Sequence, residues 1–369
     1  MAGMEGVNFM LRNAGLRVLI ALHDNPLGDI NSLSKQAKMS PATFARNLRK
    51  LQAEGILDKG GFVSTQISYS AVGLELVAIL MNIPQENLRI VENMCEMHPY
   101  STYRVRCFGS TNGIFALFAV PAGSISFLLQ LLDTLRKNGV FTDYHWHRLL
   151  NQQIYTEADF RLYDNRTGTW NFDWNEWEKT VDKGNSFTLE ECPPSVLHQM
   201  TAVDMQVLKQ LSFDARKERK EIAKEVGIPP YHLSRRLKFY RQNNVNGAYR
   251  ILFGLTSLNL VTPALAECVV DAQAKERIGY AASKLPFQGN FIPTETGFIL
   301  YSTLPAPDFP KLAAALLKHV EKAGLMWCDY ASSVRYWFDS DEESNFRDGK
   351  WLATREFLVD DILKGLELE

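Results

Sequence analysis

One sequence pattern occurs twice in this chain. Residues 40–57 read SPATFARNLRKLQAEGIL and residues 229–245 read PPYHLSRRLKFYRQNNV. Aligning Leu48 with Leu237, an offset of 237 − 48 = 189, places apolar positions on apolar ones and basic positions on basic ones. The matched pairs are Phe44/Leu233, Arg46/Arg235, Arg49/Lys238, Leu51/Tyr240 and Ile56/Val245. Similarity at so long a period indicates that one structural unit is present twice, so the fold has to be built from two related halves.

The composition is that of an ordinary globular protein. The 369 residues are 46% hydrophobic and 22% charged, which is enough for the cores of roughly two to four domains. The five cysteines are scattered without a Cys-x-x-Cys pair, so we expect reduced thiols and neither disulfides nor a zinc site. The first residues lack the continuous apolar core of a signal peptide, and we expect a cytoplasmic protein.

A membrane span is the alternative for one segment. Residues 108–132 carry no charged side chain and are long enough to cross a bilayer. The sequence PAGS at 121–124 interrupts the segment, however, and a strand over 114–120 followed by a turn and a helix from Ile125 explains it better. We therefore expect no membrane association.

Charge is distributed unevenly along the chain. Residues 12–56 hold seven Lys/Arg against three Asp/Glu, and residues 204–245 hold ten against five. Residues 156–191 hold four against nine, and residues 339–369 hold four against ten. The net charge of −2 conceals this pattern, which favours nucleic-acid binding by the two repeated segments.

The repeated unit has the pattern of a winged helix-turn-helix. Apolar residues at helical spacing predict helices over 16–22 and around 30–37. Ser40 as N-cap and Pro41 at the first helical position begin a third helix. Residues 56–65 then predict two short strands around a Gly-Gly turn, which would form the wing.

After this unit, each half contains the order strand–helix–strand–strand–helix–strand, which is the ferredoxin-like arrangement. The last helix of the second half is expected to end at Gly324, the counterpart of Gly139 (324 − 139 = 185). We predict an α+β fold with two copies of a winged helix-turn-helix followed by a ferredoxin-like βαββαβ module. The predicted domains are 1–62 and 196–248 (winged helix-turn-helix), 63–155 and 249–338 (α/β modules), 156–195 (acidic, Trp-rich linker) and 339–369 (acidic C-terminal extension).

This order of elements resembles the leucine-responsive regulator (Lrp/AsnC) family of bacterial and archaeal transcription factors. In residues 204–245 an Asp opens the first helix, EIAKEVGIPP follows, and the third helix leads into a short apolar stretch, as in the family pattern. Residues 70–74 (SAVGL) and 255–260 (LTSLNL) resemble the segment before the family's first α/β strand. The chain departs from the family by carrying two units of each kind and an acidic, Trp-rich insert. The resemblance implies a DNA-binding regulator whose α/β modules pair.

The third helix of each unit holds the candidate DNA contacts, because this helix enters the major groove in helix-turn-helix proteins. The outward residues are Thr43, Arg46, Asn47 and Lys50 in the first copy, and Tyr231, His232, Arg235, Arg236 and Phe239 in the second. Arg and Asn can bond guanine and adenine bidentately, whereas Arg49, Lys238 and Arg241 are better placed for phosphates. The alternative is that these are solvated helix faces. The basic run at 216–220 is either a phosphate contact or a solvated loop.

The resemblance also implies effector-binding turns at 109–113 and 293–297. The candidate effector-binding residues are Gly109, Asn112, Gly113, Thr296 and Gly297. Neither turn shows the Gly-Asp-aromatic-Asp run that is usual in the family, which leaves an amino-acid effector in doubt.

Two further groups have alternative interpretations. His145 and His147 lie on one face of a predicted strand. No carboxylate or Cys accompanies them at ligand spacing, so an exposed or partly satisfied strand face is favoured over a metal pair. Trp170, Trp174 and Trp177 stand at i, i+4 and i+7. Packing onto the first α/β module is favoured over a contact with another protein.

We expect a sequence-specific, double-stranded DNA-binding transcriptional regulator that forms a homodimer, with pairing of the modules inside one chain as the alternative. We expect no enzyme, cofactor or metal, since no phosphate-binding loop, nucleophile elbow, His-Glu-x-x-His or Cys/His constellation occurs. One alternative is a tetrapyrrole enzyme, because siroheme decarboxylases are built on a similar frame; His98, His145 and His147 would then lie near the substrate. The other is a scaffold for protein contacts.

Overall fold

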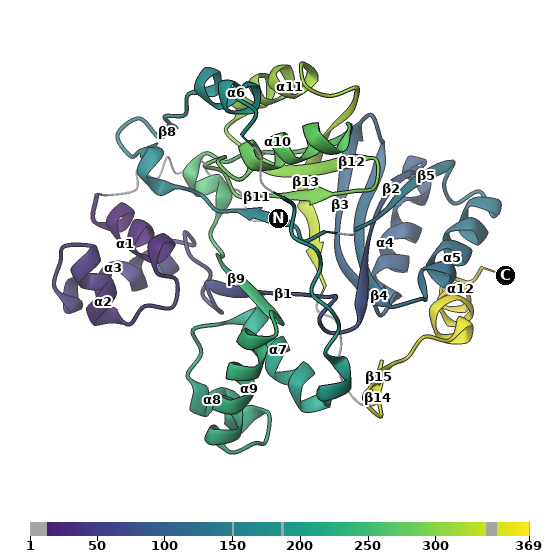
Figure 1. Cartoon of the computed structure of the whole chain (residues 1–369), viewed down its shortest axis with the longest axis horizontal. Coiled ribbons are helices and arrows are strands. Elements are labelled where there is room, and N and C mark those ends of the chain that lie inside the picture. The colour runs from purple at the N-terminus through teal and green to yellow at the C-terminus, as the bar shows by residue number, and fades with distance from the viewer. Residues whose placement is uncertain (1–12, 150, 186–187, 337–344, 369) are drawn as a thin grey trace.

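The structure is a computed structural model that describes residues 13–149, 151–185, 188–336 and 345–368. Each half contains a three-helix unit (Figure 1). The first unit consists of α1 (Asn13–Asp24), α2 (Ile30–Gln36) and α3 (Pro41–Ala53), and the second of α7 (Ala202–Phe213), α8 (Arg219–Glu225) and α9 (Pro230–Gln242). Helix α3 begins where the sequence predicts, because the Ser40 side chain accepts a hydrogen bond from the Thr43 N–H. Among the described helices, none has the length and apolarity needed to span a bilayer.

Two α/β modules follow the helical units. The first module consists of β2 (Leu74–Asn82), α4 (Leu88–Met97), β3 (Ser101–Gly109), β4 (Gly113–Pro121), α5 (Ile125–Lys137) and β5 (Asp143–Arg148). The second consists of β10 (Thr262–Val269), α10 (Ala272–Ala282), β11 (Gly289–Pro293), β12 (Gly297–Leu304), α11 (Phe309–Leu317) and β13 (Lys322–Arg335). Both show the predicted order of strands and helices, and the predicted α+β fold class is confirmed.

The two modules share one nine-stranded sheet, in the order β5-β2-β4-β3-β13-β10-β12-β11-β6, where β6 is Ile154–Thr156. They meet where β13 pairs with β3, with Cys328 opposite Cys107. At the far edge β6 pairs with β11, and β6 follows β5 in the chain. The last strand of each half therefore extends into the sheet of the other half, so the modules pair within one chain.

The sheet curls so that strands distant in its order face one another. The hydroxyls of Tyr103 on β3 and Tyr301 on β12 are 3.1 Å apart. The buried side chains between these strands form the inner-face cluster, which consists of Ala78, Leu80, Val105, Cys107, Phe115, Leu149, Leu265, Ile292, Ile299, Met326 and Cys328. This cluster draws on both modules and covers apolar strand faces that we expected a second chain to cover.

The predicted pairing of the modules between two chains is therefore corrected, while the homodimer itself stays a prediction. Light scattering at micromolar concentration checks it. A mass near 83.8 kDa (2 × 41.9) supports the homodimer, and a mass of 41.9 kDa that does not rise with concentration contradicts it.

The predicted wing hairpin is wrong. Strand β1 (Val63–Ile67) pairs with β9 (Asn246–Ile251) of the other half, and Val63 lies opposite Ile251. Leu57 likewise bridges to Phe253. Val63 and Ile251 are 0% and 2% exposed, so burial against the distant strand stabilises this pairing over a local turn. We call β1 and β9 together the ribbon.

The last helix of the second half is shorter than predicted. Helix α11 ends at Leu317, and Gly324 lies in β13 opposite Glu267. A Cβ at Gly324 would stand 2.7 Å from Ser110 Oγ, so this glycine allows a close contact between neighbouring strands. Gly139, by contrast, follows α5 with φ 73°, as a helix end requires.

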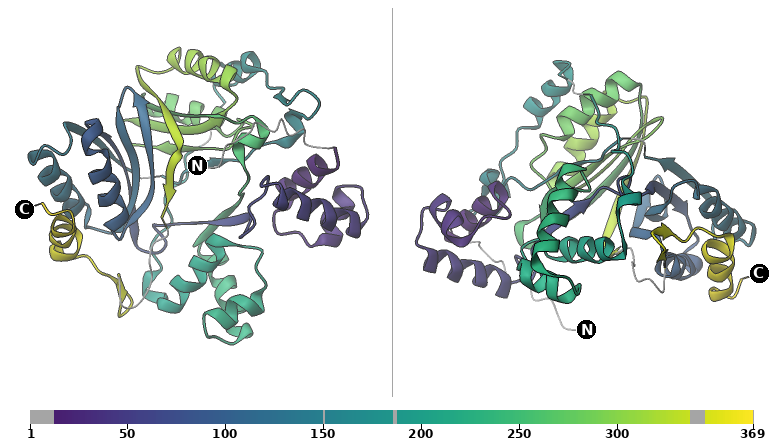
Figure 2. Two further views of the ribbon diagram at one scale, coloured as in Figure 1. Left: turned by 180° about the vertical axis from the view of Figure 1, so that it is seen from behind. Right: turned by 60° about the horizontal axis from the view of Figure 1, so that its bottom comes forward.

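Each large hydrophobic cluster combines parts of both halves. One includes Val18 and Phe44 of the first helical unit together with Leu300 of the second module. The other includes Leu208 and Tyr240 of the second helical unit together with Val77 and Phe118 of the first module. The helical units form two separate bundles beside the α/β body in Figures 1 and 2, and each shares a core with the module of the opposite half.

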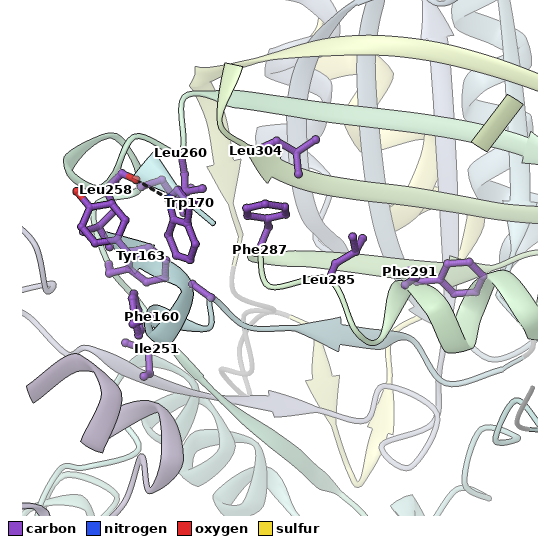
Figure 3. Packing of buried hydrophobic residues seen from close by; sticks show 14 of the residues in the cluster. Phe160, Tyr163, Trp170, Ile251, Leu258, Leu260, Leu285, Phe287, Phe291 and Leu304 are labelled. Carbon is purple, nitrogen blue, oxygen red and sulfur yellow. Dashed lines mark hydrogen bonds between the residues drawn. The ribbon is translucent and has the colours of Figure 1, made fainter. Parts of the chain in front are cut away.

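The three tryptophans pack onto the second module, not the first. They belong to the first extension, which contains β7 (Tyr163–Asp164), β8 (Thr169–Trp170) and α6 (Trp174–Asp182). Trp170 Nε1 donates to Leu258 O at 2.8 Å, and Trp177 Nε1 donates to Ala281 O at 2.8 Å. Figure 3 shows Trp170 between Tyr163 and Phe287 in this core. Packing was the favoured interpretation, but the partner is the other half.

The second extension covers the first module in return. It contains β14 (Phe346–Arg347), β15 (Lys350–Trp351), a π-helical turn (Glu356–Asp360) and α12 (Asp361–Gly365). Trp351 Nε1 donates to Val72 O at 2.6 Å, and the Tyr100 hydroxyl donates to Leu352 O at 2.8 Å. The two extensions are therefore exchanged between the halves.

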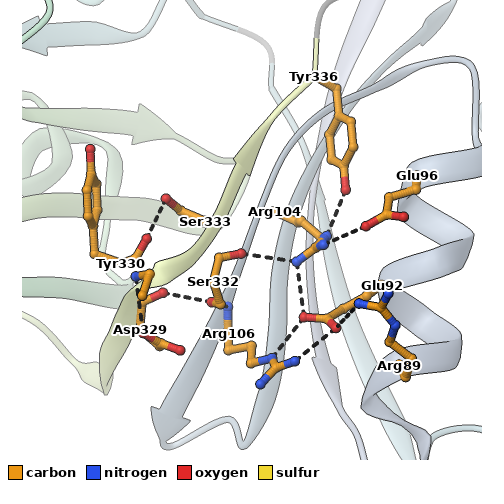
Figure 4. Close-up of polar contacts among 11 residues, drawn as sticks. Arg89, Glu92, Glu96, Arg104, Arg106, Asp329, Tyr330, Ser332, Ser333 and Tyr336 are labelled. Atoms are coloured by element: carbon orange, nitrogen blue, oxygen red, sulfur yellow. Dashed lines mark hydrogen bonds and ion pairs between the residues drawn. The ribbon is translucent and has the colours of Figure 1, made fainter. Parts of the chain in front are cut away.

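A buried ionic network fixes the place where β13 joins the first module (Figure 4). The carboxylate of Glu92 on α4 is 2% exposed; it accepts hydrogen bonds from Arg106 at 2.8 and 2.9 Å and from Arg104 at 3.1 Å. Arg104 also donates to Ser332 O at 3.0 Å and to the Tyr336 hydroxyl at 2.7 Å. Both hydrogen-bonding partners of Glu92 carry a positive charge, so the two ion pairs offset the free-energy cost of burying its carboxylate.

Candidate functional sites

Helix α3 presents part of its predicted DNA-binding face to solvent. Arg46 and Arg49 are exposed, and Thr43 and Lys50 are half-buried. The Asn47 amide donates to Thr43 O of the same helix at 2.8 Å, and Lys50 pairs with Glu54 at 3.4 Å. The guanidinium of Arg46 is thus the side chain of this face best placed for a base edge.

Helix α9 presents a larger basic face. Arg235, Lys238 and Arg241 are exposed, and Tyr231 is 70% exposed. His232 lies beside Tyr231, with ring centroids 4.2 Å apart. Guanidinium, ammonium and aromatic groups together suit contacts with bases and phosphates.

Arg236, predicted to contact DNA, is engaged inside the protein. Its Nη1 lies 2.8 and 2.6 Å from the two carboxylate oxygens of Asp204, which is 0% exposed. The Tyr240 hydroxyl donates to the same carboxylate at 2.7 Å, and Asp204 closes a capping box with Thr201 at the start of α7. Arg236 therefore compensates a buried charge, which the spacing of outward positions on α9 did not reveal.

The basic run at 216–220 is mostly paired internally. Arg216 donates to Pro26 O at 2.5 Å and to Gly28 O at 2.9 Å. Lys217 pairs with Glu225, and Lys220 pairs with Glu218. These internal pairs argue against a phosphate-binding loop. Arg216 instead connects the two helical units through its hydrogen bonds.

The predicted effector turns are closed by their own contacts. Asn112 accepts a hydrogen bond from Gly109 N–H at 3.3 Å and donates back to Gly109 O at 3.2 Å. A Cβ at Gly113 would lie 2.2 Å from Met81 O, and one at Gly297 would lie 1.9 Å from Cys268 O. Thr296 is exposed at the tip of the β11–β12 turn. These glycines are explained by close strand contacts, and an effector role for the turns stays a prediction.

The two strand histidines meet a carboxylate that the sequence did not indicate. His147 Nε2 lies 2.6 Å from Glu267 Oε1, and His145 Nδ1 lies 3.9 Å from the other oxygen. Burial favours the neutral acid, yet the hydrogen bond and charge of the histidines hold the pKa of Glu267 below its ordinary value. Because β5 and β10 belong to different halves, 120 residues separate this pair, and only the three-dimensional fold brings it together.

A cleft of about 610 Å³ opens between the ribbon, the start of β2 and the β5–β6 connection. Tyr69, Tyr155 and Arg148 are among the residues that line it. Arg250 lies behind Tyr155, with its Cζ 5.3 Å from the centre of the ring. Arg250 pairs with Glu157, with 3.0 Å between Nε and Oε1, while burial and the nearby charge of Arg250 lower the pKa of Arg335.

Two observations bear on the buried histidine and on metals. His98, named with the tetrapyrrole alternative, is 3% exposed, and burial lowers its pKa to about 3, so it stays neutral. Among the described residues, Glu178, Asp182 and His319 bring ligand-type atoms within 4.8 Å of one another. Lys318 Nζ already lies 2.6 Å from Glu178 Oε1, so an ion pair accounts for part of this group.

Comparison with known proteins identifies solved structures that have a similar fold. No protein-family model and no curated protein sequence matches the chain. The crystal structure of the siroheme decarboxylase NirDL is similar over 96% of this chain and 100% of its own, with a TM-score of 0.53 and 16% identity. The same enzyme in co-complex with an iron-uroporphyrin III analogue matches over 90% and 96%, with a TM-score of 0.51 and 16% identity.

Shorter transcription regulators match one part of the chain. A Neisseria meningitidis regulator in complex with L-Met covers 38% of this chain and 91% of its own, with a TM-score of 0.32 and 19% identity. AsnC of E. coli covers 39% and 95%, with a TM-score of 0.30 and 16% identity.

The expectation that this chain is not an enzyme is corrected by these findings. Two solved structures that match 96% and 90% of the chain are those of an enzyme, so the scaffold is one on which catalysis occurs. The expectation rested on the absence of short catalytic motifs. A search for short motifs cannot detect a site that is assembled from distant strands, such as the pair of Glu267 and His147.

Proposed function

We propose that this chain binds double-stranded DNA through α3 and α9 and regulates transcription. The observation that carries the proposal is the exposed basic faces of both helices. Arg46, Arg235, Lys238 and Arg241 form no ion pair within the described part of the chain. Basic side chains held in solvent on two helix-turn-helix units are available for phosphates and guanine edges.

Replacing Arg235 and Lys238 together by Ala should weaken DNA binding. We expect a loss of about 1–3 kcal/mol for a lost base contact, and a smaller salt slope for the lost phosphate contact. Fluorescence anisotropy with duplexes selected from genomic DNA measures both. As a control, Lys137→Ala with Lys364→Ala removes the same charge from exposed positions on α5 and α12. Equal losses in the two double variants would show that total charge, not α9, determines affinity.

Affinity of the unaltered chain should fall steeply with salt. Each phosphate neutralised by Lys or Arg releases counterions, with a slope of about −0.9 per contact in a plot of log affinity against log salt. A flat profile between low and physiological ionic strength would contradict DNA binding.

Tetrapyrrole chemistry in the α/β body is the second candidate function. The observation that favours it is the cleft lined by Tyr69, Arg148 and Tyr155, since guanidinium and tyrosine groups suit the carboxylates of a tetrapyrrole. The whole-length likeness to siroheme decarboxylase supports this candidate. His145 and His147, beside Glu267, would be the groups able to hold or move a proton.

Titration with iron uroporphyrin III tests the second candidate. A saturable shift of the Soret band, weakened at least tenfold by Arg148→Gln, supports it. Arg166→Gln, at an exposed position in the first extension, is the matched control. No spectral shift, or equal binding by both variants, would contradict it.

A further inference from the structure

The segments that follow the two third helices are hydrogen-bonded to each other in the ribbon and at its ends. At the two ends of the ribbon, Leu252 N–H donates to Phe62 O at 2.8 Å, and Ser68 N–H donates to Val245 O at 2.9 Å. Val245 lies three residues after the end of α9, and Phe62 lies one residue before β1. The ribbon therefore links the chain that leaves each third helix to the other half.

Arg216 makes a second link, from the turn between α7 and α8 to the turn between α1 and α2. Its guanidinium donates to Pro26 O and Gly28 O and lies 5.5 Å from the ring centre of Phe62. The neighbouring Ala215 N–H donates to Val63 O at 2.7 Å. Two links at different places restrict rotation of one unit against the other, so the separation of α3 and α9 is set by the chain itself.

The two helices share one basic position and differ around it. Arg46 and Arg235 are equivalent under the 189-residue offset, and both are exposed. Ala42 corresponds to the exposed Tyr231, and Lys50 corresponds to Phe239. The same guanidinium is thus presented beside different neighbours, which would select different bases next to a shared guanine.

We infer that one chain recognises a duplex with two unlike half-sites at one fixed spacing; this rests on the proposed DNA binding. In symmetric helix-turn-helix dimers identical helices read a palindrome, with half-sites about one helical turn or a multiple apart. Here one covalent chain presents two different helices, so the sequence it reads lacks two-fold symmetry. Inserting five base pairs turns the second half-site about half a helical turn away from its helix.

Selection of bound duplexes from a random library by the full chain, followed by sequencing, provides the first test. We expect two conserved segments of different sequence, separated by a constant length. Inserting five base pairs between them should lower affinity at least tenfold. The double variant Arg46→Ala/Arg49→Ala should lose discrimination in one segment only, and Arg235→Ala/Lys238→Ala in the other only.

Arg216→Ala tests the link between the helical units. It should reduce the penalty of the five-base-pair insertion, whereas Lys220→Ala, four residues away and paired with Glu218, should leave that penalty unchanged. A selected palindrome, or an insertion tolerated by the unaltered chain, would overturn the inference while DNA binding stands. Failure to select any duplex would overturn the proposed DNA binding and the inference with it.

Discussion

Replacing Arg236 by Met should lower the free energy of unfolding by about 3–5 kcal/mol, because it leaves a buried carboxylate without its cation. Asp204 is 0% exposed, and Arg236 Nη1 contacts both of its oxygens. Tyr240 and Thr201 would still donate hydrogen bonds to Asp204, but neither carries a positive charge. Urea unfolding followed by circular dichroism measures the change.

Arg235→Met is the matched control, since Arg235 is the preceding residue on the same helix and is exposed. We expect it to change the free energy of unfolding by no more than about 0.5 kcal/mol. The two variants should therefore separate two roles: Arg236→Met loses stability, and Arg235→Met loses DNA affinity. Equal stability of both proteins would mean that the Asp204 pair contributes nothing to folding.

Replacing Glu92 by Gln should also destabilise the protein by about 3–5 kcal/mol near neutral pH. The change leaves Arg104, which is 5% exposed, with only the partly exposed Glu96 as an anionic partner, and it leaves Arg106 without its bidentate carboxylate. Glu75→Gln is the control, because its pair with Arg148 lies nearer the surface. A loss in the control equal to that in Glu92→Gln would contradict the special role of the buried network.

The Glu92 network should also make stability depend on pH. The hydrogen bond from Arg106, with the charges of Arg104 and Arg106, holds the pKa of Glu92 below the ordinary value of 4.5. A carboxylate with a lowered pKa contributes its full stability above the unfolded value and loses it as pH falls through the folded value. Urea midpoints should therefore fall below about pH 4.5 in the unaltered protein and fall less in Glu92→Gln.

Local sequence signals predicted the helical units and the order of the modules. The Ser40 N-cap and the 189-residue repeat correctly indicated α3 and its counterpart α9. These signals did not indicate which strand or surface each element packs against. Residues 56–65 contain a Gly-Gly turn typical of a hairpin, yet β1 pairs with β9 about 180 residues away, where both strands bury apolar side chains.

The candidate sites show the same limit. Arg235 and Arg236 are neighbours on a basic helix, and no local pattern tells which one faces Asp204. His147 was predicted without a carboxylate partner, because Glu267 reaches it only when the sheet curls. Residue spacing along the chain cannot predict ion pairs between distant segments. Helix caps and apolar periodicity depend on neighbouring residues only, so the sequence predicts them directly.

The exchange of extensions and helical units between the halves bears on how such a protein can be made. A half produced alone would carry its tryptophan-rich extension without the surface that Trp170 and Trp177 fill, and its module without the cover that Trp351 provides. Two separate polypeptides would have to be synthesised in equal amounts and find each other before aggregating. Joined in one chain, each half meets its complement at an effective concentration on the order of millimolar, whatever the level of expression. Fusion of the halves thus makes correct one-to-one assembly independent of how many copies the cell produces.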